Sequence, residues 1–391
     1  MEPIRVGVVG VGNMGSAHAK NILDGKVRGM TLAAVCDIEP QKLCWAEENL
    51  PGAARFSDYE EMLQSGLIDM VIVATPHYLH PPMGISGFRH GLHVLIEKPA
   101  GVYVKQVEEL NAAAKQSGKL FGIMLNQRMN SLYRKARALV QSGALGEPKR
   151  CVWIITNWYR TQAYYDSGSW RATWAGEGGG VLLNQCPHHL DLWQWIFGMP
   201  QRIRGFCRYG RWHDIEVEDD VTAYAEYENG ATGLLITSTG ETPGTNRLEI
   251  SGDKGKLVLE DGKMTFWELS APEREFCFTS KDGFLMPETT RHEIRPDGED
   301  TAHIGILQNF ADAVLYGEPL IAPGYDGING LQISNAIHFS DWTGETVELP
   351  VNGERFYEML RERASHSRQK KHVVSEISDL QGTYNDRWKS R

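Results

Sequence analysis

The sequence lacks any hydrophobic run that could cross a membrane, because no apolar stretch approaches the roughly 18 residues that a transmembrane helix requires. Cysteine is also scarce: six residues are scattered over a chain of 391, and no two of them form a Cys-x-x-Cys motif. We therefore expect no disulfide framework, no zinc or other metal site, and a reducing, cytoplasmic environment. The first residues run almost directly into a predicted strand, which leaves no room for a signal peptide.

Positive charge is in the minority as well. Lysine and arginine number 40 against 50 acidic residues, so the formal net charge is −10. This balance argues against nucleic acid as the main partner. The chain is longer than one typical domain and 41% of its residues are hydrophobic, so we expect two domains with ordinary cores.

Residues 1–125 alternate short apolar runs with helical stretches, a pattern that predicts a doubly wound parallel sheet of the Rossmann type. The run at 70–75 is uniformly apolar and is typical of a central strand. The predicted strands are 4–9, 32–36, 70–75, 93–96 and 120–125, with helices at 40–50, 59–65 and 102–117.

The strongest motif follows the first strand. Residues 4–9 run into Gly10-x-Gly12-x-x-Gly15, and a helical pattern begins at about Ser16. Gly10 permits a tight turn, Gly12 lets backbone approach a pyrophosphate, and Gly15 lets the helix pack on the strand. Amides at the start of such a helix attract phosphate. The motif predicts a dinucleotide site, although the same spacing also occurs in structural glycine turns.

Asp37 points to the kind of dinucleotide. It ends the second strand, about 20 residues after the glycines, where an acidic side chain can bind a ribose 2′-hydroxyl. A carboxylate would repel the 2′-phosphate of NADP, and no arginine follows directly, so we expect NAD.

Ligands of such sheets bind beyond the carboxyl ends of the strands. His77 and His80 lie in one such loop, either as packing histidines or as site residues. Glu97 and Lys98 follow another strand; because charged residues are rarely buried alone, they form either a salt bridge at the strand end or part of the site. The expected cofactor contacts are Gly10, Gly12, Asn13, Met14, Gly15, Asp37, Thr75, Pro76, His77, His80, Glu97, Lys98 and Asn126.

From about residue 149 the pattern changes to strands separated by turn residues. This predicts an α+β domain with an open, mostly antiparallel sheet, interrupted by a long helix at 181–197. Residues 270–302 show no sustained period and are expected to be mostly loop. Domain boundaries are placed at 1–125 and 126–391, with a polar tail from about 365. The other predicted elements are helices at 132–142, 303–316 and 327–342, a short run at 345–350, and strands at 150–158, 202–210, 221–228, 231–237, 248–251, 256–260 and 264–269.

Polar residues of the predicted helix at 181–197 share one face. Asn184, His188 and Asp191 are spaced at i, i+4 and i+7. A carboxylate within one turn of an imidazole can hold its tautomer and raise its basicity. Such a pair is also common as a purely structural contact. Pro187 either kinks this helix or begins it, and in the second case Asn184 precedes the first turn.

An aromatic segment lies just upstream, between Trp158 and Trp174. Indole and phenol rings stack on sugars, while arginine binds hydroxyls, so the segment is either a polyol site or an aromatic subunit interface. The expected substrate contacts, including Arg128 near the domain junction, are Arg128, Tyr159, Trp170, Arg171, Trp174, Asn184 and Asp191.

Taken together, these motifs resemble the Gfo/Idh/MocA oxidoreductases, a family that includes glucose–fructose oxidoreductase and inositol dehydrogenase. The resemblance runs from Arg5 to about Pro350 through GVGNMG, ATPHYLH, EKPAG, the GGG segment with HHLD, and NFADAV. It implies that Lys98 contacts the substrate hydroxyl beside the nicotinamide.

The family's Asp-x-x-x-His pair corresponds to Asn184 and His188, and Asp191 to a further acidic position. An amide thus replaces the usual carboxylate, and an amide cannot serve as a base. The proton relay is then expected at Lys98, His188 and Asp191. The WR-x-x-W loop resembles that of members acting on glycosides or anhydro-sugars.

Three functions follow as expectations. The first is NAD-dependent oxidation of a secondary hydroxyl of a sugar, glycoside, anhydro-sugar or cyclitol, with Lys98 and His188 as catalytic residues. The second is a redox-neutral glycoside-cleaving or epimerising enzyme that recycles tightly bound NAD. The third is a non-catalytic NAD or sugar sensor, which would not require the lysine and histidine. We also expect a homodimer or homotetramer, because a one-sided sheet must cover its apolar face.

Overall fold

The computed structural model describes residues 2–298, 300–368 and 370. Its N-terminal part is a six-stranded sheet with the strand order β3-β2-β1-β4-β5-β6, in which all pairs are parallel. The predicted doubly wound fold is confirmed, with the strand order reversing between β1 and β4. The elements are β1 Ile4–Val9, α1 Asn13–Leu23, β2 Met30–Cys36, α2 Pro40–Asn49, β3 Ala54–Phe56, α3 Tyr59–Gln64, β4 Met70–Val73, η1 His77–Leu79, α4 His80–Arg89, β5 His93–Ile96, α5 Val104–Ser117, β6 Phe121–Ile123 and η2 Asn126–Met129.

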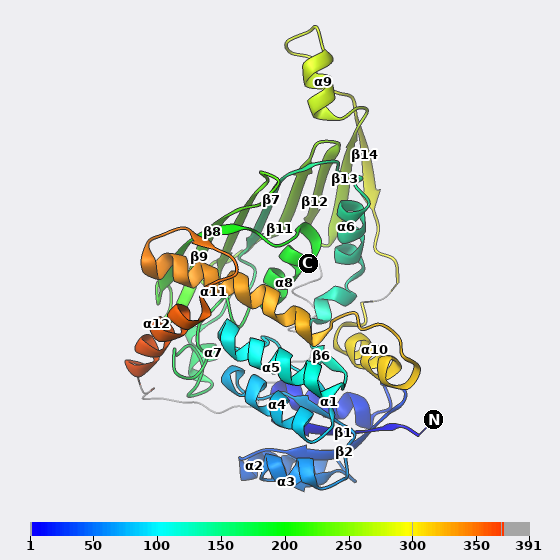
Figure 1. Ribbon diagram of the computed structural model, residues 1–391, viewed down its shortest axis with the longest axis vertical. Helices are drawn as coiled ribbons and strands as arrows, with labels where there is room; N and C mark the ends of the chain where they lie inside the picture. The colour runs from blue at the N-terminus through cyan, green and yellow to red at the C-terminus, as the bar shows by residue number, and fades with distance from the viewer. Residues whose placement is uncertain (1, 299, 369, 371–391) are drawn as a thin grey trace.

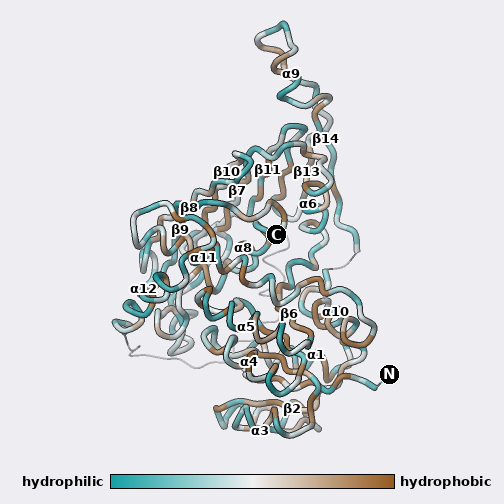
Figure 2. Tube along the Cα trace, in the orientation of Figure 1, coloured by the Kyte–Doolittle hydropathy of each residue, from teal (hydrophilic) through white to brown (hydrophobic). Residues whose placement is uncertain are grey.

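The second sheet has nine strands in the order β14-β13-β12-β11-β7-β10-β9-β8-β15. Only β7 and β10 pair in parallel, so the prediction of a mostly antiparallel sheet is confirmed. Hydrophobic residues recur along its strands (Figure 2). The elements are α6 Ser131–Gln141, β7 Pro148–Ile155, α7 Gln162–Asp166, α8 Pro187–Phe197, β8 Arg202–Tyr209, β9 Glu218–Glu226, β10 Thr232–Ser238, β11 Asn246–Gly252, β12 Gly255–Glu260, β13 Lys263–Leu269, α9 Glu273–Thr279, β14 Thr289–Ile294, α10 Ala302–Tyr316, η3 Gly324–Asp326, α11 Gly327–Thr343, β15 Val347–Glu348 and α12 Gly353–Ser365.

Helix α11 joins the two parts, lying between the large sheet and α5 (Figure 1). It approaches β8 closely because Gly205 has no side chain: a Cβ there would lie 2.5 Å from the carbonyl oxygen of Ile337. Asn335 fixes the helix to the start of α5, donating to the carbonyl of Val102 at 3.0 Å and accepting from the amide of Val104 at 3.1 Å. The ends of the parallel strands are thereby held against the second domain.

The chain returns to the first sheet after α10. The amide of Ile123 in β6 donates to the carbonyl of Ala322 at 3.1 Å, and Gly122 forms an antiparallel bridge with Pro323. The rings of Phe121 and Tyr325 meet edge to face, with centroids 5.6 Å apart. Residues near 322 therefore cover the outer edge of β6.

The predicted helix at 181–197 is wrong in its first third, because the helix begins at Pro187. Proline has no amide hydrogen to donate and is therefore favoured at a first helical position. The preceding residues form turns: the amide of Asn184 donates to the carbonyl of Gly180 at 2.9 Å, and that of Cys186 to Val181 at 2.8 Å.

The segment at 270–302 is mostly irregular over its described length, as predicted, but it also contains two elements that the pattern did not indicate. These are α9, which projects beyond the rest of the molecule (Figure 1), and the edge strand β14. Because β14 carries polar residues on both faces, Arg291 and Glu293 on one and His292 on the other, it shows no hydrophobic alternation. Helix α12 was likewise not anticipated. Most of the expected C-terminal tail lies outside the described residues. Among the helices that the structure describes, none is long and apolar enough to span a bilayer.

Candidate active site

The turn between β1 and α1 has the three glycine roles that the motif predicts. Gly10 has φ +88°, and a Cβ there would lie 2.5 Å from the carbonyl oxygen of Ala74. A Cβ on Gly15 would lie 1.8 Å from the carbonyl oxygen of Gly10, so strand and helix meet without room for a side chain. Gly12 has no neighbour within 4 Å of its Cβ position. It is the glycine whose surroundings are open to a ligand.

Asp37 lies beside this turn and is 6% exposed. Its Oδ2 accepts the amide of Val11 at 2.7 Å and its Oδ1 accepts the amide of Glu39 at 2.9 Å. Helix α1 begins at Asn13 and Met14, with Gly12 as its N-cap. Open backbone at Gly12, the helix start and a fixed carboxylate fit the pyrophosphate and the ribose of NAD.

Glu97 occupies the end of β5 with a partner that the sequence reasoning missed. Its Oε1 lies 2.7 Å from Nε2 of His18 in α1, whose side chain is fully buried. Burial raises the pKa of Glu97, but the hydrogen bond and charge of His18 outweigh it and bring the pKa to about 2. The His303 ring lies 5.7 Å from that of His18, and its Nδ1 is 3.4 Å from Nδ2 of Asn126. A charged carboxylate is thus held beside Lys98.

Lys98 extends from β5 across to the second domain. Its Nζ donates to the carbonyl of Asn184 at 2.9 Å, and its own amide donates to Oε2 of Glu97 at 3.1 Å. Burial lowers the pKa of Lys98, while the negative charge of Glu97 acts in the opposite direction. The two catalytic candidates also influence one another: burial, followed by the positive charge of Lys98, holds the pKa of His188 well below its usual value. The imidazole of His188 is therefore neutral at pH 7.

Asp191, which was expected to pair with His188 and raise its basicity, is bound by Arg128, and the pKa of His188 is lowered rather than raised. Nε and Nη2 of Arg128 donate to the two carboxylate oxygens of Asp191, at 2.9 and 2.7 Å. Nη1 of Arg128 donates to Asp326 at 2.7 Å, and Arg128 is only 1% exposed. The two ion pairs of Arg128 connect η2 with α8 and η3. Arg128 and Asp191 are therefore buried residues that hold these elements together.

The side chain of Asn184 is held at both ends. Its Oδ1 accepts the hydroxyl of Tyr164 at 3.1 Å, and its Nδ2 donates to Oε1 of Glu177. The Tyr164 hydroxyl in turn accepts Nη1 of Arg171 at 3.0 Å and Nε2 of Gln185 at 3.2 Å. The aromatic segment is thereby tied to the residue that also binds Lys98.

The loop after β4 reaches the same region. His77 is 5% exposed, and its ring lies edge to face with Trp170 at 5.6 Å. Burial and the charges of His80 and Lys98 hold its pKa well below the usual value. His80 is a packing residue in this fold, with ring nitrogens 2.7 Å from the carbonyls of Thr75 and Pro99. Pro76, also expected at the cofactor, is the residue before η1.

The remaining aromatic candidates differ in exposure. Tyr159 is 42% exposed on the loop after β7. Trp174, at 6% exposed, packs edge to face on His338 and Trp342 in the interior of the second domain, with ring centroids 5.7 and 5.6 Å away. Trp170 is half-buried with Arg171 over its ring at 4.6 Å, which makes these two the better placed for a ligand.

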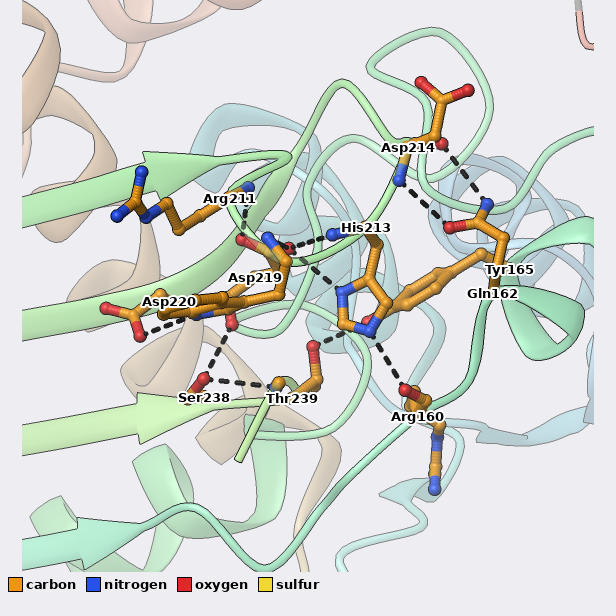
Figure 3. A network of polar contacts seen from close by, with 12 residues as sticks. Arg160, Gln162, Tyr165, Arg211, His213, Asp214, Asp219, Asp220, Ser238 and Thr239 are labelled. Atoms are coloured by element: carbon orange, nitrogen blue, oxygen red, sulfur yellow. Dashed lines mark hydrogen bonds and ion pairs between the residues drawn. The ribbon is translucent and has the colours of Figure 1, made fainter. Parts of the chain in front are cut away.

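A polar network around Asp219 and His213 holds the start of the aromatic segment (Figure 3). Asp219 accepts the amides of Arg211, Trp212 and His213 at 3.0, 2.8 and 3.1 Å. His213 lies between Oδ2 of Asp219 at 3.0 Å and the carbonyl of Arg160 at 2.9 Å. The ring of Tyr165 packs against that of His213 at a tilt of 58°, and its hydroxyl shares a hydrogen bond of 2.7 Å with Thr239. The start of the aromatic segment is thus fastened to β9 and β10.

Sequence reasoning missed His18, Tyr164, Glu177 and His303 as members of the site. One signal was available: a carboxylate at the buried end of a strand requires a partner, and the first helix passes close to that end. Glu177 lies in an irregular turn, so no helical or strand periodicity in the sequence indicates that its side chain faces the site.

An open glycine turn beside a fixed carboxylate, connected to a lysine through the contact between His18 and Glu97, fits a nicotinamide-dependent oxidoreductase. Comparison with family models agrees. Residues 4–125 match the oxidoreductase family with an NAD-binding Rossmann fold, and residues 133–258 match the GFO/IDH/MocA C-terminal domain. The chain belongs to the GFO/IDH/MocA oxidoreductases, and NAD is its cofactor.

Individual relatives are distant but cover nearly the whole chain. It is 24% identical to a scyllo-inositol 2-dehydrogenase (NAD(+)) of Bacillus subtilis, over 89% of this chain and 97% of the relative. It is 25% identical to a D-glucoside 3-dehydrogenase of Escherichia coli, over 89% and 98%. The WlbA dehydrogenase of Chromobacterium violaceum, solved with NADH and UDP-GlcNAcA, superposes with a TM-score of 0.77 and 26% identity, over 90% of this chain and 97% of that one.

Proposed function

We propose that this oxidoreductase oxidises a secondary hydroxyl of a sugar, glycoside, anhydro-sugar or cyclitol. The observation that carries the proposal is the position of Lys98, which leaves the first sheet beside Glu97 and donates at 2.9 Å to the carbonyl of Asn184, four residues before His188. An amine and a neutral imidazole from different domains are thereby brought to the carboxyl ends of the parallel strands, where ligands of such sheets bind.

The chemistry divides between the cofactor and the chain. Bound NAD⁺ supplies the hydride acceptor. Lys98 stabilises the negative charge that develops on the substrate oxygen, and Glu97 favours the charged form of the amine. His188, neutral at pH 7, accepts the hydroxyl proton directly or through Lys98.

Substrate recognition is assigned to the aromatic segment. Trp170 offers a partly open indole face, and Arg171 and Asn184 offer groups that hydrogen-bond hydroxyls. The sugar and cyclitol dehydrogenases among the relatives support this substrate class. Tyr159, exposed on the loop before α7 in the same aromatic segment, is a further candidate contact.

The proposal is tested by incubating the purified protein with NAD⁺ and a panel of cyclitols, aldoses, glycosides and anhydro-sugars, with NADH absorbance as the readout. We expect NADH to accumulate with at least one compound. Cleavage or epimerisation without NADH accumulation would indicate the redox-neutral alternative, in which NAD is recycled. Tight binding of NAD and sugars with no chemistry would indicate a sensor and overturn the proposal.

We also propose that a second copy of the chain covers the outer face of the large sheet, in a cytoplasmic homodimer or homotetramer. Phe206 on β8 is 50% exposed and Tyr224 on β9 is 40% exposed, and the two strands pair directly. The free thiols of all six cysteines suit a reducing compartment. Light scattering on the purified protein tests the oligomer; a monomer at micromolar concentration would contradict it.

A further inference from the structure

Glu177 is a buried carboxylate that the proposed chemistry does not use. It lies in the turn before Gly178 and is 2% exposed. Its Oε2 accepts the amide of Ala172 at 2.5 Å, and its Oε1 accepts Nδ2 of Asn184. Its carbonyl oxygen lies 3.3 Å from Nδ1 of His77. One residue therefore connects the aromatic segment, the residues before α8 and the loop after β4.

The contacts of Asn184 leave its amide a single orientation. The amino end faces a carboxylate, which can only accept, and the carbonyl end receives the hydroxyl of Tyr164 at 3.1 Å. The main-chain carbonyl of the same residue accepts Nζ of Lys98 at 2.9 Å. The position of Lys98 is thus linked through Asn184 to Glu177.

We propose that Glu177 is a positioning residue of this site: by holding the side chain of Asn184 it fixes the place of this residue, whose main-chain carbonyl binds Lys98 and whose Oδ1 binds Tyr164. The effect on turnover rests on the proposed function, whereas the effect on the folded state does not. Burial raises the pKa of Glu177, with the positive charge of Arg171 acting against it. A second carboxylate at position 184 would therefore face Glu177 in surroundings that disfavour two negative charges.

The test uses three variants of the full chain. Asn184→Asp places two carboxylates in contact, and Glu177→Gln replaces an acceptor oxygen by an amino group. The double variant Asn184→Asp/Glu177→Gln reverses donor and acceptor but keeps the hydrogen bond between the two side chains. Asn130→Asp is the matched control, because Asn130 donates at 3.1 Å to the exposed carboxylate of Asp300, outside the site.

The first readout is the melting temperature between pH 5 and pH 8, which requires no substrate. In Asn184→Asp the new carboxylate has a raised pKa in the folded state, so its penalty grows as the pH rises. We expect the melting temperature to fall below that of wild type by about 2–4 °C or more at pH 8 and to approach it at pH 5. The double variant should show no such dependence, and Asn130→Asp a smaller one because water screens Asp300.

The second readout is turnover with a substrate found in the panel. A misplaced lysine should lower kcat by up to about 10²-fold in Asn184→Asp and Glu177→Gln, with KM for NAD⁺ unchanged. The double variant should recover most of this loss. Melting curves of Asn184→Asp that parallel wild type at every pH, or a double variant no better than either single one, would overturn the proposal. Failure to find any substrate would count against the proposed function and leave the melting result to decide this inference.

Discussion

His18 and Glu97 are buried hydrogen-bonding partners in the first domain, with 2.7 Å between Nε2 of the imidazole and Oε1 of the carboxylate. His18 comes from the first turns of α1, immediately after the glycine turn, and Glu97 precedes Lys98. The cofactor cradle and the catalytic lysine are therefore connected by one contact. His303 of α10 lies against the same imidazole, and burial and that neighbour lower its pKa to about 4.

This pair should make stability depend on acidity. The pKa of Glu97 falls from 4.5 to about 2 on folding, so the ionised carboxylate stabilises the folded state fully above pH 4.5 and loses this effect as the pH falls toward 2. We expect Glu97→Gln to melt below wild type at pH 7, and the gap to shrink progressively between pH 4.5 and pH 2. Melting curves followed by circular dichroism measure this. A gap that stays constant over that range would contradict it.

Two substitutions in the glycine turn should have different effects, one on stability and the other on NAD binding. Gly15→Ala must displace the backbone of Gly10, so it should destabilise the protein by at least about 1–3 kcal/mol. Gly12→Ala fills open space and should melt close to wild type. It should instead weaken NAD binding at least about tenfold, because a hydrogen bond to a charged group contributes roughly 1.5–3 kcal/mol. Denaturation and calorimetric titration separate the two effects; equal loss of stability in both variants would contradict the assignment.

Removing the amine of Lys98 should abolish most of the activity. We expect Lys98→Ala to lower turnover by roughly 10²–10⁴-fold, the range for a positioned acid–base or charge-stabilising group. NAD binding should persist, because the glycine turn and Asp37 are unchanged. Lys105→Ala is the matched control: Lys105 pairs with Glu354 at 2.6 Å on the surface and should leave turnover unaltered. Full activity in Lys98→Ala would remove the lysine from the mechanism.

The pH profile tests the role of His188. A base must be unprotonated, and the pKa of His188 lies well below its ordinary value of 6.5 because of burial and the charge of Lys98. Activity should therefore persist as the pH falls through 6.5, with the acid limb of kcat/KM well below that value. His188→Ala should lose roughly 10²–10⁴-fold, and His292→Ala, on the exposed β14, should not. An acid limb at or above 6.5 would argue against a neutral imidazole.

The ion pair between Arg128 and Asp191 predicts a large loss of stability. Arg128→Met leaves a buried carboxylate without its cation and should cost about 3–5 kcal/mol. Arg128→Met/Asp191→Leu removes both charges and should cost less than the single variant. Urea titration gives both values. If the double variant is as unstable as the sum of the two single ones, the charges are not coupled as the geometry indicates.

Regular, hydrophobic elements could be predicted from the sequence. β4 is buried at every position and β1 at all but Arg5, so their uniform apolarity was unambiguous. β14 was missed because its residues are largely exposed and give little hydrophobic signal. α12 did carry such a signal, since Phe356 and Leu360 are buried one turn apart, and it was overlooked because the segment is rich in charged residues. The start of α8 at Pro187 could not be decided from the sequence, because a proline can either begin a helix or kink one.

The site was predictable where a motif dictates geometry. The roles of the three glycines and the position of Asp37 follow from the strand-to-helix turn. The contacts of Arg128 and Asp191 did not follow, because residues 63 positions apart become partners only when η2 packs on α8. The same holds for Glu177, whose place beside Asn184 is set by turns rather than by a repeat.

The return of the chain to β6 matters when the first domain is expressed as a separate fragment. The strand is three residues long, and its outer edge is closed by Ala322 and Pro323 from far along the sequence. A fragment that stops at residue 125 would contain the entire glycine turn. It would, however, leave the outer backbone edge of β6 unpaired, and an unpaired edge can pair with another molecule. Expression of the nucleotide-binding half alone should therefore yield aggregates, and fusing residues 302–326 to it should restore a dispersed product.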